Sequence, residues 1–227
     1  MVEPAQTVSE TDGSMSFDVL APHYRWMELV SAGEKLQRCR TAFLSHVPKA
    51  NNILILGEGN GRFLLECRRR FPHAAITVVE ASARMIELAR KRLARQNVAH
   101  DRIDFILADA LTWIPPVRSF DLIVTHFFLD CFRADQLEVL IAKLARTAAP
   151  NANWLLADFQ AAPAGWRRRR SRAILWLMYR FFIAATQLPA RTLTAPDDLL
   201  DRNGFDLRAR EIYDWELLHS DWWTLRA

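Results

Sequence analysis

The sequence is poor in cysteine, carries little net charge and has no long apolar run, and each shortage argues against a class of protein. Its three cysteines in 227 residues never form a C-x-x-C pair, which argues against a disulfide framework or a zinc site and favours a reducing, cytoplasmic setting with no bound metal. No apolar run reaches the ~18 residues that a membrane span requires. Residues 1–14 are polar, so we expect no signal peptide.

The overall composition predicts one ordinary globular domain. An apolar content of 51% supports a substantial core, and the sequence shows no repeat and no low-complexity linker. A net charge of +4 is lower than that of a dedicated nucleic-acid binder. We predict a mobile tail at 1–15, a single domain at 16–227 and a helical insert at about 163–190.

Residues 52–65 predict a strand, a tight turn and a helix. Four aliphatic residues at 53–56 indicate a buried strand of a parallel sheet. The glycines that follow lack a Cβ, so the backbone of the turn can approach a ligand closely. The unpaired N–H groups at the start of the next helix would face the same ligand. This is the arrangement of a nucleotide-type site.

The glycine spacing then separates two cofactors. A dinucleotide site needs G-x-G-x-x-G, but Arg62 stands at the third glycine position, so we do not expect NAD. The G-x-G-x-G turn resembles the first motif of the class I S-adenosylmethionine-dependent methyltransferases, although a purely structural turn is the alternative. The resemblance implies S-adenosyl-L-methionine as cofactor, with its methionine half against four residues of the turn: Gly57, Glu58, Gly59 and Gly61.

Two carboxylates at predicted strand ends support this resemblance. Glu80 follows the predicted strand at 75–79, and an acidic group there can accept both ribose hydroxyls. Asp109 follows the strand at 103–107, and the resemblance implies that it takes the adenine amine. For each, a solvated strand-end carboxylate is the alternative. The neighbours Ala81, Met85 and Ala110 complete the expected contacts, with Met85 as a core residue the alternative.

The sequence departs from the family at one position. The family usually has an acidic residue two positions before the first glycine, where this chain has Ile55; Glu58 could supply the missing charge. Residues 17–24 resemble the N-terminal segment of the small-molecule, quinone-biosynthesis-type enzymes. There the aromatic residue, here Tyr24, helps to close the site; the alternative is a packed aromatic side chain.

Alternating strand and helix patterns define the expected fold. The predicted strands are at 53–56, 75–79, 103–107, 120–125, 153–159, 205–213 and 215–225. The predicted helices are at 60–71, 82–96, 136–148, 173–188 and 196–203, after two N-terminal helices from Ser16. This pattern predicts a Rossmann-like, doubly wound α/β fold. Its seven-stranded sheet would be mostly parallel, with an antiparallel C-terminal edge pair, N-terminal helices and the helical insert.

Three residues are candidates for chemistry. Methyl transfer requires a docked nucleophile, exclusion of water and, where needed, removal of a proton. His126, Asp130 and Asp158 all stand near the ends of central strands, and His126 has a pKa suited to a general base. The alternatives are that His126 only lines the cofactor cleft, that Asp130 caps the following helix, and that Asp158 bonds a backbone amide or an acceptor group.

The predicted insert bears on the acceptor. Its helix is apolar nearly all round, so it is buried on several sides, roofs an apolar pocket or lies on a membrane surface. Five arginines at 167–172 fit an anionic lipid surface or a solvated helix start. We predict methyl transfer to a small apolar or amphipathic molecule. The alternatives are a nucleic-acid methyltransferase and a non-catalytic module; a peripheral membrane contact and a homodimer are further expectations.

Overall fold

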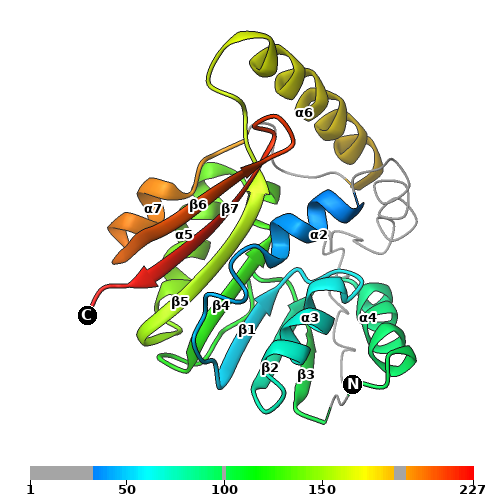
Figure 1. The fold of residues 1–227 in the computed structure, drawn as a ribbon, viewed down its shortest axis with the longest axis vertical. Coiled ribbons are helices and arrows are strands. Elements are labelled where there is room, and N and C mark those ends of the chain that lie inside the picture. The colour runs from blue at the N-terminus through cyan, green and yellow to red at the C-terminus, as the bar shows by residue number, and fades with distance from the viewer. Residues whose placement is uncertain (1–32, 99–100, 187–192) are drawn as a thin grey trace, which may run out of the picture.

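The computed structural model describes residues 33–98, 101–186 and 193–227 (Figure 1). The predicted tail, the predicted helix from Ser16 and the candidate Tyr24 therefore lie outside the described residues. The side chains of residue 179 and of residues 181–186 also lie outside the description.

Seven strands form one mixed sheet with the order β3-β2-β1-β4-β5-β7-β6. The strands are β1 (Asn52–Leu56), β2 (Ala75–Glu80), β3 (Ile103–Leu107), β4 (Phe120–His126), β5 (Ala148–Phe159), β6 (Phe205–Tyr213) and β7 (Leu218–Leu225). The first five are parallel, and β7 pairs antiparallel with both β5 and β6. The predicted doubly wound sheet with an antiparallel edge pair is confirmed. The strand order reverses between β1 and β4, where open α/β sheets bind ligands.

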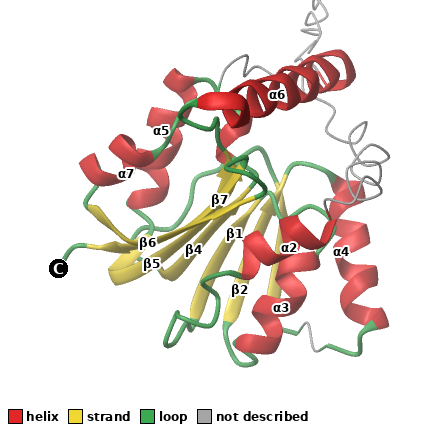
Figure 2. Ribbon diagram, turned by 45° about the horizontal axis from the view of Figure 1, so that its top comes forward, coloured by secondary structure: helices red, strands yellow, loops and turns green. Residues whose placement is uncertain are grey.

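Helices cover both faces of the sheet (Figures 1 and 2). They are α2 (Gly33–Thr41), α3 (Arg62–Arg70), α4 (Ala83–Arg95), α5 (Ala134–Ala145), α6 (Gly165–Thr186) and α7 (Asp197–Arg202). One core lies under α3 and α4, where Phe63 and Leu93 meet Ile53 of β1. The other lies under α5 and α7, where Ile141 and Leu200 join a core that includes Trp154 of β5. Each central strand is therefore buried on both faces, which explains its unbroken apolar sequence.

Several predicted boundaries are wrong. Strand β5 begins at Ala148, not at 153. Helix α5 ends at Ala145, not at 148, because Ala148 already pairs with Phe120 in the sheet and Pro150 cannot continue a helix. Strand β7 begins at Leu218, not at 215, because residues 214–217 form the turn after β6. Helix α6 begins at Gly165, not at 173, so the arginine cluster lies within the helix.

Candidate active site

The glycine turn is closely packed against its neighbours. Gly61 has φ +82°, and a Cβ at this position would lie 2.8 Å from the Cα of Ala89 in α4. The helix after the turn has no side-chain cap at Gly61; Glu58 Oε1 accepts a hydrogen bond from the Leu64 amide at 2.9 Å instead. Burial raises the pKa of Glu58 to about 7. Glu58 therefore holds the start of α3, a role that the sequence did not suggest.

Glu80 ties the tip of β2 to the glycine turn. Its Oε2 accepts the Gly59 amide at 3.0 Å, and its Oε1 accepts the Ser82 amide at 3.0 Å. The turn and the acidic strand end are thus one hydrogen-bonded unit. This geometry fits the residue set that S-adenosylmethionine requires.

Asp109 lies at the same edge of the sheet, because β3 pairs in parallel with β2. Its Oδ1 accepts the Leu111 amide at 2.8 Å and shapes the loop after β3. Lys143 of α5 stabilises this loop: its Nζ donates hydrogen bonds to the carbonyl oxygens of Ala110, Leu111 and Trp113. The sequence did not single out Lys143, since nothing local indicates that a helical lysine binds the carbonyl groups of a distant loop.

Two of the expected cofactor contacts, Ala81 and Met85, have different degrees of exposure. Met85 is buried, as the core alternative expected, while Ala81 is only half-buried. Helix α4 begins as predicted, with the Ser82 hydroxyl accepting the Met85 amide at 3.2 Å. Met85 therefore belongs to the structural core whether or not it also touches a ligand.

His126 ends β4 beside the turn. It is 6% exposed, and its ring meets the ring of Phe63 edge-on at a centroid distance of 4.4 Å. Neither ring nitrogen has a hydrogen-bond partner within the described residues. Burial, and then the charge of Arg40, lower the pKa of His126 well below its ordinary value, so the imidazole is neutral near pH 7. A neutral imidazole has one N–H donor and one free lone pair.

Asp130 and Asp158 form a buried pair. Asp158 accepts the amides of Asp130 and Phe159 at 3.1 and 2.9 Å, which matches the alternative of a backbone hydrogen bond. Asp130 does not cap α5, because that helix begins after Arg133 and Asp130 lies in a short 3-10 turn. Burial raises the pKa of Asp130 to about 6 and that of Asp158 well above its ordinary value. Burial and the mutual repulsion of the two carboxylates therefore disfavour ionisation of both groups together.

A second polar network lies beside this pair on β7 and β6. His219, the register partner of Asp158, lies 3.0 Å from Asp221 through its Nδ1. Asp221 is fully buried and accepts two hydrogen bonds from Arg210, at 2.7 and 2.6 Å. Arg210 also pairs with Asp197 of α7. Local sequence patterns do not predict this network, because antiparallel pairing of distant strands brings its members together.

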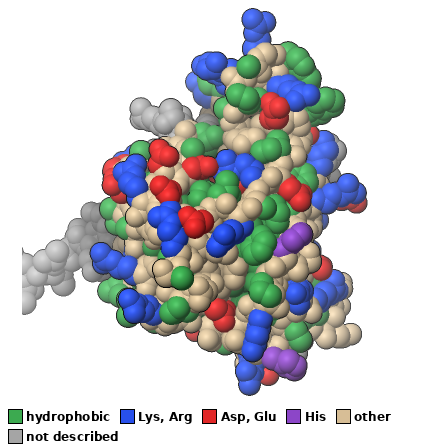
Figure 3. All heavy atoms as spheres, turned by 60° about the vertical axis from the view of Figure 1, so that its left-hand side comes forward, with side chains coloured by type: hydrophobic (Ala, Val, Ile, Leu, Met, Phe, Trp, Pro, Cys, Tyr) green, Lys and Arg blue, Asp and Glu red, His purple; other side chains and the backbone are tan. Residues whose placement is uncertain are grey.

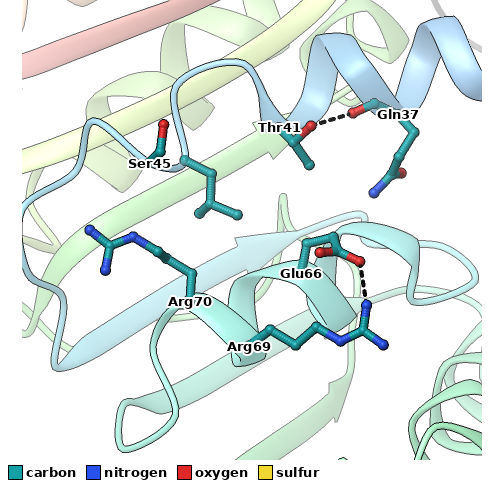
Figure 4. Close-up of a pocket in the computed structure, with 7 residues that line it drawn as sticks. Gln37, Thr41, Ser45, Glu66, Arg69 and Arg70 are labelled. Atoms are coloured by element: carbon teal, nitrogen blue, oxygen red, sulfur yellow. Dashed lines mark hydrogen bonds and ion pairs between the residues drawn. The ribbon is translucent and has the colours of Figure 1, made fainter.

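The described residues also set limits on the site. Within them, no group of three His, Cys, Asp or Glu side chains is placed to hold a metal ion, and no helix is long and apolar enough to cross a bilayer. A groove of about 490 Å³ lies between α2 and α3 (Figure 4). It contains none of the predicted site residues, and Glu66 and Arg69 on its wall pair with each other. We therefore place the site at the strand ends and not in this groove.

Fold and site together define a class of protein. The strand order and the antiparallel β7 are those of the Rossmann-like methyltransferase fold, and in this chain the acidic end of β2 is hydrogen-bonded to the glycine turn. Residues 53–151 match the family described as a methyltransferase domain. Residues 53–151 therefore carry a methyltransferase domain, and the cofactor that this match implies is S-adenosylmethionine.

The curated relatives are named as methyltransferases of different acceptors. The chain is 34% identical over 107 residues to a malonyl-[acyl-carrier protein] O-methyltransferase of Priestia megaterium, covering 47% of this chain and 36% of that protein. It is 35% identical over 71 residues to a tRNA1(Val) (adenine(37)-N6)-methyltransferase of Vibrio parahaemolyticus, covering 31% and 29%. The chain thus spans only about a third of the length of these curated relatives.

The fold is shared over a longer stretch. The N-methyltransferase NodS from Bradyrhizobium japonicum WM9, solved with S-adenosyl-L-homocysteine, superposes with a TM-score of 0.59. This superposition covers 86% of this chain and 85% of NodS at 17% sequence identity. At that identity the likeness concerns the fold.

Proposed function

We propose that the protein transfers a methyl group from S-adenosylmethionine to a small apolar or amphipathic acceptor. The observation that carries the proposal is the hydrogen-bonded unit of Glu80 and the glycine turn at the point where the strand order reverses. Glu80 would hold the ribose and Asp109 the adenine, while the turn would meet the methionine half. The cofactor supplies an electrophilic methyl group on a sulfonium centre.

The chain supplies groups that can take a proton from an acceptor. His126 is neutral and buried, so its free ring nitrogen is available as a base without prior deprotonation. The Asp130–Asp158 pair is the second candidate, since burial raises the pKa of both carboxyls. Both stand at the carboxyl ends of β4 and β5, where the acceptor would meet the methyl group.

The position of helix α6 is an argument for an apolar acceptor. It lies above the carboxyl ends of the parallel strands (Figure 2), and Leu175 packs there in one apolar cluster with Ala157 and Phe159. Met178 packs against the same cluster. Not all of the helix is covered, because Trp176 and Leu177 are exposed. This placement is that of a lid over the strand ends.

A nucleic-acid acceptor has less support. The tRNA-modifying relative matches only 31% of the chain. Two of the five clustered arginines are engaged, Arg167 with Glu216 and Arg170 with Asp214. On the face shown in Figure 3, basic and acidic side chains are interspersed, which does not favour a polyanion.

Calorimetric titration tests the proposal. We expect S-adenosylmethionine and S-adenosylhomocysteine to bind and NAD to show no binding, since Arg62 replaces the third glycine of the dinucleotide motif. Transfer of a labelled methyl group to small apolar alcohols, acids and amines, compared with transfer to total tRNA, then reports the acceptor class. Cofactor binding with no transfer to any panel would favour a non-catalytic module, and NAD binding alone would overturn the assignment.

A further inference from the structure

The turn between β6 and β7 has a backbone conformation that residues with a side chain resist. Asp214, Trp215 and Glu216 have φ angles of +45°, +58° and +68°, and none of the three is a glycine. The left-handed region raises the energy of a residue that has a Cβ, so a run of this kind persists only where surrounding contacts hold it. The turn therefore stores strain that neighbouring elements must hold in place.

Ion pairs from two helices hold this turn. Arg167 Nη1 of α6 lies 2.8 Å from Glu216 Oε1, and Arg170 Nη2 lies 3.2 Å from Asp214 Oδ2. Arg170 also donates to the carbonyl oxygen of Asp214 at 3.2 Å, so it binds the strained backbone itself. From the other side, Lys35 Nζ of α2 lies 2.8 Å from Asp214 Oδ1. One short turn thus binds both α2 and α6.

Two tryptophans add an aromatic contact at the surface. The ring centroids of Trp166 in α6 and Trp215 in the turn lie 5.6 Å apart. The guanidinium of Arg167 lies 6.0 Å from the first centroid and 5.7 Å from the second. Trp166 is 58% exposed and Trp215 is 57% exposed. Because both indoles are already largely in water, this contact can separate without uncovering a core.

The rest of α6 packs on the protein through a narrow face. Leu175 is buried, and Ile174 and Met178 pack against the same apolar cluster, while Trp176 and Leu177 are exposed. The contacts with the turn come from the first two turns of this 22-residue helix. Since a helix moves as a rigid element, contacts at its start set the direction of its whole length over the sheet (Figures 1 and 2).

We propose that the turn at 214–216 is a clasp that holds α6 closed over the carboxyl ends of the strands, and that its release lets α6 swing away from them. The geometry defines two states. In the closed state the ion pairs and the ring contact hold the strained backbone, and in the open state the turn relaxes to ordinary angles. Salt screens exposed ion pairs and so favours opening. The use of opening for acceptor entry rests on the proposed function, whereas the clasp itself does not.

Hydrogen exchange followed by mass spectrometry tests the clasp without any ligand. Asp214→Asn combined with Glu216→Gln removes both anions, and we expect the α6 amides at 166–178 to exchange about 10-fold faster than in the wild type. In ~1 M salt the wild type should approach the rate of this double variant. Asp206→Asn is the matched control, because it removes an ion pair with Arg226 at the other end of the same hairpin, and it should exchange as the wild type.

A charge exchange tests whether Arg167 and Glu216 act as a pair. Arg167→Glu or Glu216→Arg alone places like charges in contact and should speed the exchange of α6. The two substitutions together restore an ion pair and should return the rate toward that of the wild type. Amides of β4 serve as the internal reference in every variant, since general loss of stability would speed their exchange as well.

A thiol reports whether release uncovers the strand ends. Cys131 is half-buried and packs against the cluster that contains Leu175. We expect a small maleimide to label Cys131 roughly 10-fold faster in the double variant than in the wild type. Cys67, which is buried in the core under α3, is the control within the same molecule and should keep its rate.

Three results would overturn the inference. The first is an α6 exchange rate that stays the same in the double variant and, for the wild type, in salt. The second is faster exchange that appears equally in β4, and the third is faster α6 exchange with no faster labelling of Cys131. The wild-type salt series does not depend on the folding of a variant. None of these measurements uses a cofactor or an acceptor, so failure of the clasp is distinct from failure of the proposed function.

Discussion

At the scale of single residues, the carboxylates of the candidate site have two roles, one in the structure of the loops and one in the proposed binding. Glu58, Glu80, Asp109 and Asp158 each accept at least one backbone amide, so each shapes its loop before any ligand arrives. An alanine substitution would therefore disturb structure and binding together. Amide substitutions keep the shape and remove the charge, and they are the better probes.

Glu80→Gln should weaken S-adenosylhomocysteine binding. The loss of charge-assisted hydrogen bonds to the ribose predicts a cost of about 1.5–3 kcal/mol, or roughly 10- to 150-fold in the dissociation constant measured by calorimetry. Asp104→Asn, on an exposed carboxylate of β3, is the matched control and should leave affinity unchanged. A folded Glu80→Gln protein with wild-type affinity would remove Glu80 from the cofactor site.

At the scale of elements, the turn between β1 and α3 limits which side chains are tolerated at position 61. An alanine there must adopt φ +82° and push against the backbone of Ala89. We expect Gly61→Ala to lower the free energy of unfolding by about 2–5 kcal/mol, measured by urea denaturation. Gly165→Ala is the control: φ is +68° there, but nothing lies within 4 Å of the added Cβ, so only the smaller backbone cost of about 1–3 kcal/mol should appear.

Helix α6 carries the residues for a peripheral membrane contact, which we also propose. Arg168, Arg169 and Arg172 are exposed, and so are Trp176 and Leu177 further along the helix. Near an anionic surface each arginine contributes about 1 kcal/mol at most, and salt screens this attraction. We expect flotation with anionic vesicles that weakens as salt rises and is lost when the three arginines become glutamine.

The control for this test changes three exposed basic residues on α4: Arg90, Lys91 and Arg95. This variant should still float with the vesicles. If both variants float equally well, the α6 arginines have no part in membrane contact. Dimerisation through Trp176 and Leu177 would instead appear as a concentration-dependent mass in light scattering.

At the scale of the whole molecule, buried groups give the stability two opposed pH dependences. Glu58 titrates near 4.5 when unfolded and at about 7 when folded, so its contribution to stability is present at low pH and is lost as the pH rises through 7. His126 has a lowered folded pKa, so its contribution is present above pH 6.5 and is lost as the pH falls. The free energy of unfolding of the wild type should therefore change less with pH than either contribution would change it alone.

Variants separate the two contributions. Between pH 5 and 8, Glu58→Gln should gain stability relative to the wild type by on the order of 2 kcal/mol, since it lacks the carboxyl that must ionise while buried. His126→Gln should show the opposite trend: its free energy of unfolding should rise relative to that of the wild type as the pH falls. Urea denaturation at several pH values measures both. Parallel curves for Glu58→Gln and the wild type would show that the Glu58 pKa is not raised.

Local sequence was enough to predict the elements and their order. Runs such as 53–56, the glycine spacing from Gly57 to Gly61 and the Ser82 cap depend on neighbours within a few residues, and the structure confirms them. In a parallel sheet, strand ends lie at one edge, so the placement of Glu80 and Asp109 together also followed from the pattern. The errors came at boundaries, where sheet pairing competed with helical periodicity.

Only the tertiary structure decided which polar groups are buried and what they touch. Arg40 has the sequence position of a solvated helix end, yet it is buried and packs against Phe127, the residue after β4. The pKa values of Asp130 and Asp158 are raised because a 3-10 turn after β4 and the end of β5 bring the two side chains together in a buried place. Burial and electrostatic coupling depend on contacts between residues far apart in the chain, which local patterns do not encode.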